Sequence, residues 1–483
     1  MLARAVLAGL VVWNAVPALA QTPRALVERA VAAMGGAERL RAIDAVATDF
    51  HVVTFALGQE ETPEAQPRAS IATGRTTSDY RNARRSSHIE LRTVTGAVNR
   101  LRRVTAGGVG MLETNGRLAP DNPATLGAEE AALRRAPERL LLTALDHPEA
   151  LAPLPPRTWR GRVMRGVRYA AGPDTLALYF DPRTGLLTVT ETVADDPVLG
   201  DRRTAGWFTR WAETEGIKFP RQYDVEWNGR LQTHSVFTAV TVNPSLDDSL
   251  FVIPDSIAAR AQRPPAGPPP VIVNLVELAP GVWRAEGGSH HSLVVEQPAR
   301  LVVIEAPLHA ARSRAVLDTL RGRFPAKPVG VVVNTHHHWD HSGGLRAYLA
   351  AGVPVVTHAV NAEFVRAIAR APKTVAPDAL SRRPRAPALR LVEDSLVVGT
   401  GDTRVVVYAL PTAHVQGMVV AYVPGARLLF NSDVLSPGAT LEPAGSREIA
   451  DVVRARGLIV ERVVGGHGGI AGWQDVVAAA DSR

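Results

Sequence analysis

Ten consecutive residues, Thr335–Gly344, constrain this chain more than any other segment, because they contain the string His-x-His-x-Asp-His. Three imidazoles and a carboxylate fall within six consecutive positions, at His336, His338, Asp340 and His341. Such nitrogen and oxygen ligands hold borderline transition metals such as zinc. An apolar run (331–333) precedes the string and a helix-like segment from Leu345 follows it. We therefore expect a loop at the carboxyl end of a strand, where α/β folds place their chemistry.

The spacing within the string indicates two ions rather than one. On an extended segment His336 and His338 turn to the same side and suit one metal. Asp340 and His341 are displaced along the following turn, so we expect them to approach a second ion, while His337 points elsewhere. The missing ligands should come from other strand ends. Three candidates follow apolar, strand-like runs: His414, Asp433 and His467.

A proline-rich segment, Ala258–Pro270, divides the chain. It holds five prolines and a glycine, a composition that favours extended structure and cannot fill a core. A chain of 483 residues is too long for one ordinary core, so we predict two domains, 21–257 and 271–483. All but four of the 14 histidines follow the linker, which places the metal chemistry in the second domain.

The first twenty residues predict export. Arg4 precedes an apolar run (5–16) too short to span a bilayer, and Pro17-Ala18-Leu19-Ala20 supplies an Ala-x-Ala cleavage signal. We interpret residues 1–20 as a signal peptide and expect a periplasmic or secreted protein. No later segment is apolar enough for a transmembrane helix. The oligomeric state is left open by the sequence.

The charge of the chain does not predict a nucleic-acid partner, although the formal net charge is +7. Only three of the 54 basic residues are lysine, and the arginines are scattered among Ala, Gly, Pro and Val rather than gathered in a stripe. We therefore expect a small-molecule substrate. The absence of cysteine removes disulfides and thiolate ligands, so any metal must be held by His and Asp.

The first domain reads as mostly antiparallel β structure after an opening helix. Apolar residues recur at helical spacing over 25–43. Strand-like runs then alternate with turns, as in 176–193 around Asp181–Gly185 and in 222–242 around Asn228-Gly229. This meander resembles the curved sheet of periplasmic lipoprotein carriers. The resemblance implies an apolar concavity for an acyl chain or another hydrophobic ligand, and the alternative is a packing or dimerisation module without a ligand.

In the second domain strands alternate with helices, which predicts mixed sheets covered by helices. The order of its candidate ligands along the chain resembles that of the metallo-β-lactamase superfamily, and the resemblance covers residues 271–483. The resemblance implies a four-layer αβ/βα sandwich with metals between the sheets. Carried onto this chain, one ion is bound by His336, His338 and His414. The other is bound by Asp340, His341 and His467, with Asp433 as the bridge.

Two features depart from the commonest pattern of that family. Glu305 closes an early strand where aspartate is commoner, and we expect it to orient the ligand loop without binding metal itself. The lack of cysteine excludes the lactamase subclass that uses a thiolate ligand. An all-His/Asp set is shared by another lactamase subclass, by lactonases and by thioesterase-like members. The site therefore indicates the type of reaction more closely than it indicates the substrate.

The expected activity is hydrolysis. Two close dications lower the pKa of a shared water from 15.7 toward about 7, which creates hydroxide at neutral pH. We expect attack on an ester, lactone, thioester or amide (including lactam) carbonyl, with Asp340 as the catalytic residue that orients the nucleophile. The cofactor is two divalent ions, zinc first and iron or manganese as alternatives. Candidate substrate contacts are His290, His291 and Trp339.

Two other functions stay open at this point. An iron-dependent redox enzyme can use the same fold, because iron also occupies His/Asp sites. The di-iron, oxygen-reducing type has a carboxylate where this chain has His338, which argues against it. A periplasmic carrier of lipid or another hydrophobic ligand, with a non-catalytic metal domain, is the other alternative, and the complete ligand set argues against it.

Overall fold

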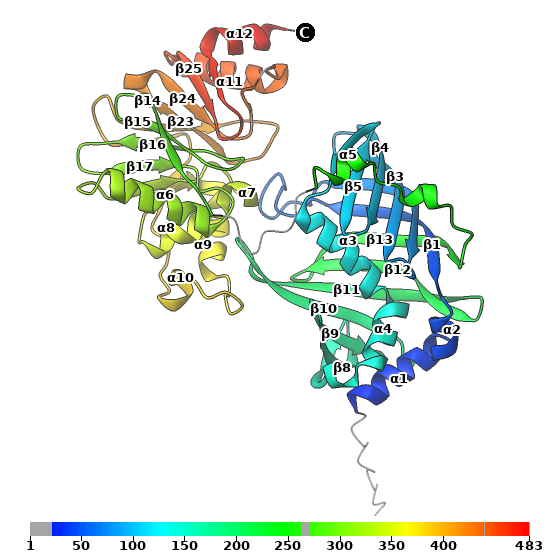
Figure 1. Cartoon of the computed structure of the whole chain (residues 1–483). Helices are drawn as coiled ribbons and strands as arrows, with labels where there is room; N and C mark the ends of the chain where they lie inside the picture. The colour runs from blue at the N-terminus through cyan, green and yellow to red at the C-terminus, as the bar shows by residue number, and fades with distance from the viewer. Residues whose placement is uncertain (1–21, 262–269, 439, 483) are drawn as a thin grey trace, which may run out of the picture.

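The N-terminal and C-terminal halves of the chain form separate sets of sheets and helices (Figure 1). The computed structural model describes residues 22–261, 270–438 and 440–482. The predicted signal peptide 1–20 lies outside these residues, as does most of the predicted linker. The domain boundaries at 257 and 271 stay predictions.

The opening helix is interrupted by two glycines, so the single helix predicted over 25–43 is wrong in one respect. Helix α1 (Pro23–Met34) is capped by Thr22, and helix α2 (Ala37–Arg41) follows it. Gly35 and Gly36 between them have φ values of 133° and 94°, which side chains with a Cβ rarely adopt. The helical periodicity was therefore correct on both sides of a break that the glycines impose.

One antiparallel sheet of 13 strands forms the N-terminal half, in the order β6-β5-β4-β3-β2-β1-β13-β12-β11-β10-β9-β8-β7. This confirms the mostly antiparallel fold with an opening helix. The strands are β1 (Ala45–Phe55), β2 (Ala69–Asp79), β3 (Arg84–Arg92), β4 (Val98–Ala106), β5 (Val109–Thr114), β6 (Arg117–Pro120), β7 (Leu151–Trp159), β8 (Arg162–Ala171), β9 (Asp174–Phe180), β10 (Leu187–Asp196), β11 (Gly200–Thr214), β12 (Ile217–Trp227) and β13 (Arg230–Val242).

Two further helices cover this sheet and were not predicted: α3 (Pro123–Arg135) and α4 (Pro137–Asp146). Their local signals were present, since each begins with proline and the Asn122 side chain accepts a hydrogen bond from Thr125 N at 2.9 Å. A cavity of about 420 Å³ lies between the helices and the sheet, with apolar and aromatic residues in its wall: Val46, Phe208, Phe219, Tyr223, Phe237 and Val240. Short helix α5 (Asp255–Ala258) ends this half.

The C-terminal half contains two mixed sheets, ordered β14-β15-β16-β17-β18-β19-β20 and β21-β22-β23-β24-β25-β26. The first sheet consists of β14 (Asn274–Ala279), β15 (Val282–Glu286), β16 (Ser292–Glu296), β17 (Leu301–Ile304), β18 (Val329–Val333), β19 (Val355–His358) and β20 (Leu389–Val392). The second consists of β21 (Ser395–Val398), β22 (Val405–Leu410), β23 (Met418–Val423), β24 (Leu428–Asn431), β25 (Arg462–Gly465) and β26 (Ile470–Gly472). Strands β20, β21 and β26 were not predicted.

Helices cover both outer faces of these sheets (Figure 1). They are α6 (Ala310–Arg323), α8 (Leu345–Ala350), α9 (Ala362–Arg370), α10 (Ala379–Arg382), α11 (Pro443–Ala455) and α12 (Trp473–Asp481). The short helix α7 (Trp339–Ser342) lies instead in the loop that follows β18. One apolar cluster joins α6, α8 and α9 to the first sheet, a second fills the space between the sheets, and a third joins α11 and α12 to the second sheet. These three apolar layers confirm the predicted αβ/βα sandwich.

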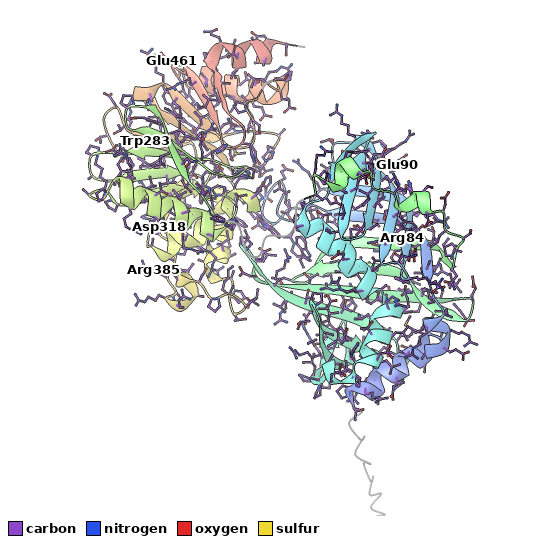
Figure 2. All side chains as sticks on the ribbon, viewed as in Figure 1. Arg84, Glu90, Trp283, Asp318, Arg385 and Glu461 are labelled. Carbon is purple, nitrogen blue, oxygen red and sulfur yellow. The ribbon has the colours of Figure 1, made fainter. Side chains whose placement is uncertain are left out.

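Aromatic packing closes the outer edge of the first layer. Trp283 on β15, labelled in Figure 2, meets Phe324 edge to face with ring centroids 5.8 Å apart. Among the residues that the structure describes, no helix is both long and apolar enough to span a bilayer.

Candidate metal centre

Four strand ends deliver the predicted ligands to one place. The loop after β18 carries His336 to His341, and the segments after β22, β24 and β25 carry His414, Asp433 and His467. Strands β18 and β24 lie in different sheets, so the ligands meet between the two halves of the sandwich. Each predicted ligand therefore lies just beyond the end of a strand, as the sequence analysis expected.

The first cluster joins His336, His338, His414 and Asp433, and their ligand atoms all lie within 4.8 Å of one another. His414 Nε2 is 3.2 Å from His338 Nδ1 and 3.3 Å from Asp433 Oδ2. His336 Nε2 lies 3.7 Å from the same carboxylate oxygen. The two rings of the His-x-His pair thus face one point, as predicted, and Asp433 joins them.

The second cluster joins Asp340, His341 and His467 with His290. His341 Nε2 is 3.2 Å from His467 Nε2 and 3.6 Å from Asp340 Oδ2. Asp433 belongs to this cluster too, because its Oδ1 lies 2.9 Å from both His341 Nε2 and His467 Nε2. Each carboxylate oxygen of Asp433 therefore faces a different cluster, the placement that a bridging ligand requires.

The donor set fits divalent metal ions. His336 is fully buried, yet its Nε2 has no hydrogen-bond partner among the described residues. Burial holds the pKa of His336 well below its usual range, and burial with the nearby His414 lowers the pKa of His338 to about 3. Both rings are therefore neutral with lone pairs available, as metal ligands must be.

The carboxylates of the site are ionised because their neighbours outweigh the effect of burial. Burial alone would raise the pKa of Asp433, but the four histidines around it (336, 341, 414 and 467) outweigh burial and hold this pKa far below the usual range. Contacts with His290 and His341 likewise outweigh burial and lower the pKa of Asp340. The neutral imidazoles of His336 and His338 therefore lie beside the ionised carboxylates of Asp340 and Asp433, an arrangement that attracts cations.

Glu305 contacts the ligand loops from beneath, as predicted. It is fully buried and accepts hydrogen bonds from Thr335 Oγ1 at 3.0 Å and from Ser432 Oγ at 2.6 Å. Its Oε2 also lies 3.4 Å from His341 Nδ1. Burial opposes a charge on His341, but Glu305 and Asp433 outweigh it and raise the pKa of His341 to about 10. The backbone of Glu305 has φ of 83°, an uncommon value for a residue with a Cβ.

His290 was predicted as a substrate contact, but the structure places it in the second cluster of candidate metal ligands. It is only 6% exposed, its Nε2 is 3.4 Å from Asp340 Oδ2, and Ser289 Oγ lies 2.8 Å from its Nδ1. An isolated β-bridge pairs His290 with His467 and brings the early hairpin over the second cluster. The sequence signal was only the Gly-Gly-Ser-His-His-Ser run, which carries no ligand spacing.

The other candidates lie outside the two clusters. His291 is half-buried and its backbone N–H donates to Gly466 O at 2.8 Å. His337 is buried against Phe364, with ring centroids 5.8 Å apart. Trp339 stacks on Trp227 of the N-terminal half at 6.3 Å. Roles for His291 and Trp339 in substrate binding stay predictions.

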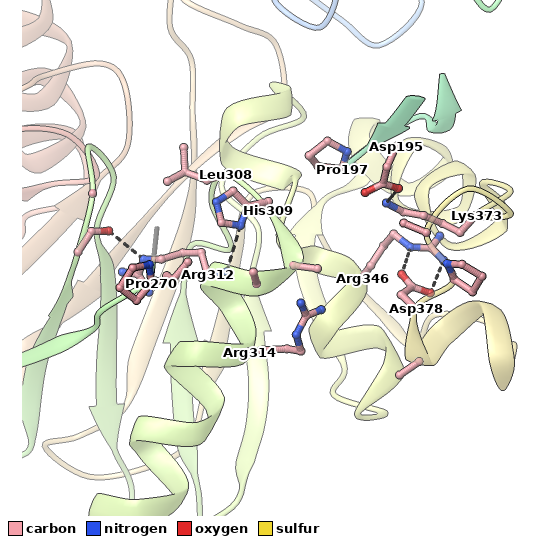
Figure 3. A pocket seen from close by; sticks show the side chains of 18 of the residues that line it. Asp195, Pro197, Pro270, Leu308, His309, Arg312, Arg314, Arg346, Lys373 and Asp378 are labelled. Atoms are coloured by element: carbon pink, nitrogen blue, oxygen red, sulfur yellow. Dashed lines mark hydrogen bonds and ion pairs between the residues drawn. The ribbon is translucent and has the colours of Figure 1, made fainter. Parts of the chain in front are cut away.

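A larger cavity lies beside the centre and does not include it. Its volume is about 840 Å³, and none of the predicted ligands is among the described residues that line it. Figure 3 shows Arg346 paired with Asp378 at one end of this cavity and Lys373 paired with Asp195. These charges are neutralised within the protein, so the cavity does not compete with the clusters as a metal site.

Sequence reasoning missed two residues of the N-terminal half that contact the ligands. Gln59 donates to Asp340, and the backbone carbonyl of Glu60 accepts from His338. They are 281 and 278 residues from their partners in sequence, and no motif marks them.

Comparisons with known proteins agree with this geometry. Residues 285–467 match the family described as the metallo-beta-lactamase superfamily. The alpha subunit of a 2,4-dinitroanisole O-demethylase from Nocardioides sp. (strain JS1661) is 27% identical over 161 residues, 33% of this chain and 45% of that relative. An acyl-coenzyme A thioesterase from Bos taurus is 27% identical over 215 residues, 38% of this chain and 72% of that relative.

Solved structures match the same half. A metallo-beta-lactamase from Pontibacter korlensis is 19% identical, with a TM-score of 0.35 and coverage of 42% of this chain and 95% of that one. One from Hirschia baltica is 17% identical, with a TM-score of 0.34 and coverage of 43% and 96%. The family match and the two His/Asp clusters together identify residues 285–467 as a metallo-β-lactamase superfamily domain.

Proposed function

We propose that this protein is an exported, dinuclear metal-dependent hydrolase acting on an ester, lactone, thioester or amide (including lactam) carbonyl. The observation that carries the proposal is the pair of clusters that share Asp433, one oxygen facing each. Two ions held this close can supply a hydroxide at neutral pH and polarise the carbonyl that it attacks.

In this proposal different residues bind the two ions, orient the nucleophile and position the ligand loops. His336, His338 and His414 would hold the first ion, while Asp340, His341 and His467 would hold the second, with His290 as a fourth ligand. Asp340 orients the nucleophile, because its Oδ2 faces the second cluster while its Oδ1 is fixed by Gln59. Glu305 holds the ligand loops in register through the hydroxyls of Thr335 and Ser432.

One face of the centre is open to a substrate. The side chains of His414 and His467 are each 27% exposed and that of Asp340 is 36% exposed, whereas His336 and His341 are fully buried. Because some of the candidate metal ligands are partly exposed, a substrate carbonyl could approach the centre from solvent. The relative that is named an acyl-coenzyme A thioesterase supports including thioesters among the substrates.

The cofactor in this proposal is two divalent metal ions, zinc first, with iron or manganese as alternatives. Nitrogen-rich His/Asp ligands support zinc without excluding the others. Elemental analysis of protein purified without added metal distinguishes them: two zinc ions per chain support the proposal, and two iron ions favour the redox alternative.

Export is supported by the sequence of residues 1–20 and places the enzyme in the periplasm or medium. N-terminal sequencing of the protein from cell fractions tests it. We expect a mature chain that begins at Gln21 in the exported fraction, and an uncleaved chain retained inside the cell would contradict export.

The hydrolase is tested by a substrate panel of lactams, lactones, thioesters and aryl esters with the metal-loaded full chain. His336→Ala should abolish turnover with the fold intact, since it removes a buried ligand of the first cluster. His88→Ala, an exposed histidine on β3, is the matched control and should match wild type. Wild-type hydrolysis by the His336→Ala protein would refute the assignment.

A second candidate function concerns the N-terminal half. The cavity of about 420 Å³ beneath α3 and α4 favours a hydrophobic ligand, as the resemblance to lipoprotein carriers also implies. A carrier whose metal domain is not catalytic would co-purify with lipid and show no hydrolysis across the panel. Extraction of the purified protein with organic solvent, followed by mass spectrometry, separates the two functions.

A further inference from the structure

A loop of the N-terminal half reaches into the metal centre. It joins β1 to β2 over Ala56–Arg68, and Figure 1 shows this blue segment extending to α7, the short helix that carries Asp340 and His341. Its contacts fall on both ligand-bearing loops of the other half, the one after β18 and the one after β22. Two halves of a chain can pack together without any contact to candidate metal ligands. The contacts of this loop with such ligands therefore require an explanation.

Gln59 contacts the ligand that the second ion would use. Its Nε2 donates a hydrogen bond of 2.8 Å to Asp340 Oδ1. The other oxygen of Asp340 faces His341 Nε2 and His290 Nε2, at 3.6 Å and 3.4 Å. The amide therefore occupies one oxygen and leaves the other directed at the cluster.

Glu60 contacts a ligand of the first ion through its backbone. The N–H at His338 Nε2 donates to Glu60 O at 3.0 Å, which leaves Nδ1 with the lone pair, and Nδ1 is the atom that faces His414. The carboxylate of Glu60, only 2% exposed, binds Arg230 of β13 at 2.6 Å and Gly58 N at 2.8 Å. The N-terminal sheet thus anchors the carbonyl that sets the tautomer of His338.

Flanking contacts hold the loop in place. Gly58 has φ of 83°, and a Cβ there would lie 2.1 Å from the Trp339 ring, so only glycine permits this approach. Gln416 N donates to Glu61 O at 2.8 Å, and Arg68 Nη2 donates to His414 O at 3.0 Å. Residues before and after Gln59 and Glu60 are therefore tied to both ligand loops.

We propose that the Ala56–Arg68 loop is a working part of the metal centre, in which Gln59 and Glu60 are positioning residues for different ions. Gln59 orients Asp340 for the second ion, and the Glu60 carbonyl orients His338 for the first. This inference rests on the dinuclear centre of the proposed function. It makes the N-terminal half a contributor to metal affinity, whatever else that half binds.

The test is a metal titration of the full-length protein that does not depend on turnover. Metal-free protein is titrated with Co²⁺, and both the affinity of each ion and its visible d–d spectrum are recorded. Gln59→Ala should weaken the second ion roughly 10-fold or more and leave the first unchanged. Glu60→Ala, which releases the loop from Arg230, should weaken the first ion by a comparable factor and shift its spectrum.

Controls separate positioning from a general loss of structure. Gln66→Ala removes an exposed glutamine of the same loop and should titrate as wild type. Glu60→Gln keeps an acceptor for Gly58 N and should recover part of the affinity that Glu60→Ala loses, and it remains informative if Glu60→Ala does not fold. Circular dichroism checks each fold.

Two results would overturn the inference: wild-type affinities for both ions in Gln59→Ala and Glu60→Ala (or in Gln59→Ala alone, if Glu60→Ala does not fold), or equal weakening of both ions in each of these two variants. The second result would indicate a purely structural loop. Failure of the hydrolase proposal is distinct, because wild-type protein would then bind two ions and hydrolyse nothing on the panel.

Discussion

Replacing Glu305 with Gln should weaken metal binding without unfolding the protein. The side chain keeps its size but loses the buried charge that accepts from Thr335 Oγ1 at 3.0 Å and Ser432 Oγ at 2.6 Å. The same charge raises the pKa of His341, which shows that it favours positive charge on that ring. A cation bound at His341 Nε2 is favoured by the same interaction, and Gln removes it.

The magnitude follows from the two hydrogen bonds. A bond to a charged acceptor contributes about 1.5–3 kcal/mol and one between neutral groups about 1 kcal/mol, so loss of charge costs about 1 kcal/mol for each. Because metal binding must then restore the order that the loosened ligand loops have lost, the sum of about 2 kcal/mol corresponds to roughly 30-fold weaker binding, since about 1.4 kcal/mol is tenfold. Substitutions outside the coordination sphere usually cost 10–100-fold, which agrees.

The assay is competition for Zn²⁺ between the full-length protein and a chromophoric chelator. Glu461→Gln is the matched control, because Glu461 is 59% exposed and its pair with Arg427 contributes little. Glu305→Asp should give an intermediate result, since it keeps the charge but is one methylene shorter. If Glu305→Gln binds zinc as tightly as wild type, Glu305 does not organise the centre and our reading of its contacts is wrong.

Three further predictions follow from the contacts described. His290→Ala should weaken the second ion about 10-fold in a Co²⁺ titration, because it removes the contact with Asp340 Oδ2, and unchanged affinity would exclude His290 from the cluster. Asp378→Asn should lower the free energy of unfolding in urea by about 3 kcal/mol, because it leaves Arg346, 1% exposed, as an uncompensated buried charge. Although burial opposes it, Arg346 lowers the pKa of Asp378, so this contribution is present above the ordinary pKa near ~4 and is lost as the pH falls toward the folded-state value. The difference between wild type and Asp378→Asn should therefore shrink in acid, and a constant difference would contradict the ion pair. Removal of metal with EDTA should abolish turnover and lower the thermal unfolding temperature, and added Zn²⁺ should restore both; an unchanged temperature would mean that the folded protein does not bind metal preferentially.

Much of the centre was predictable because its ligands follow local rules. Six consecutive positions carry four ligands, and the other three come directly after apolar strands whose ends share one edge. Glu305, which directly follows β17, was predicted from the pattern of the family that the sequence resembles. Mixed sheets covered by helices in residues 271–483 followed from the alternation of strands and helices, and the four-layer arrangement followed from the family resemblance.

The remainder depends on contacts that no local pattern encodes. Gln59 and Glu60 lie in a polar loop, and their importance arises only when the two halves of the chain pack together. His290 joins the second cluster through a single β-bridge to His467 rather than through ligand spacing. Helices α3 and α4 carried cap signals, but the strand-like pattern on either side obscured them.

The split carboxylate of Asp433 has a consequence for the order in which the protein takes up its ions. Because Oδ1 and Oδ2 face different histidine groups, the ion that arrives first neutralises charge that the later ion would also use. Uptake should therefore be stepwise and anticooperative, with a half-loaded form accumulating at limiting metal.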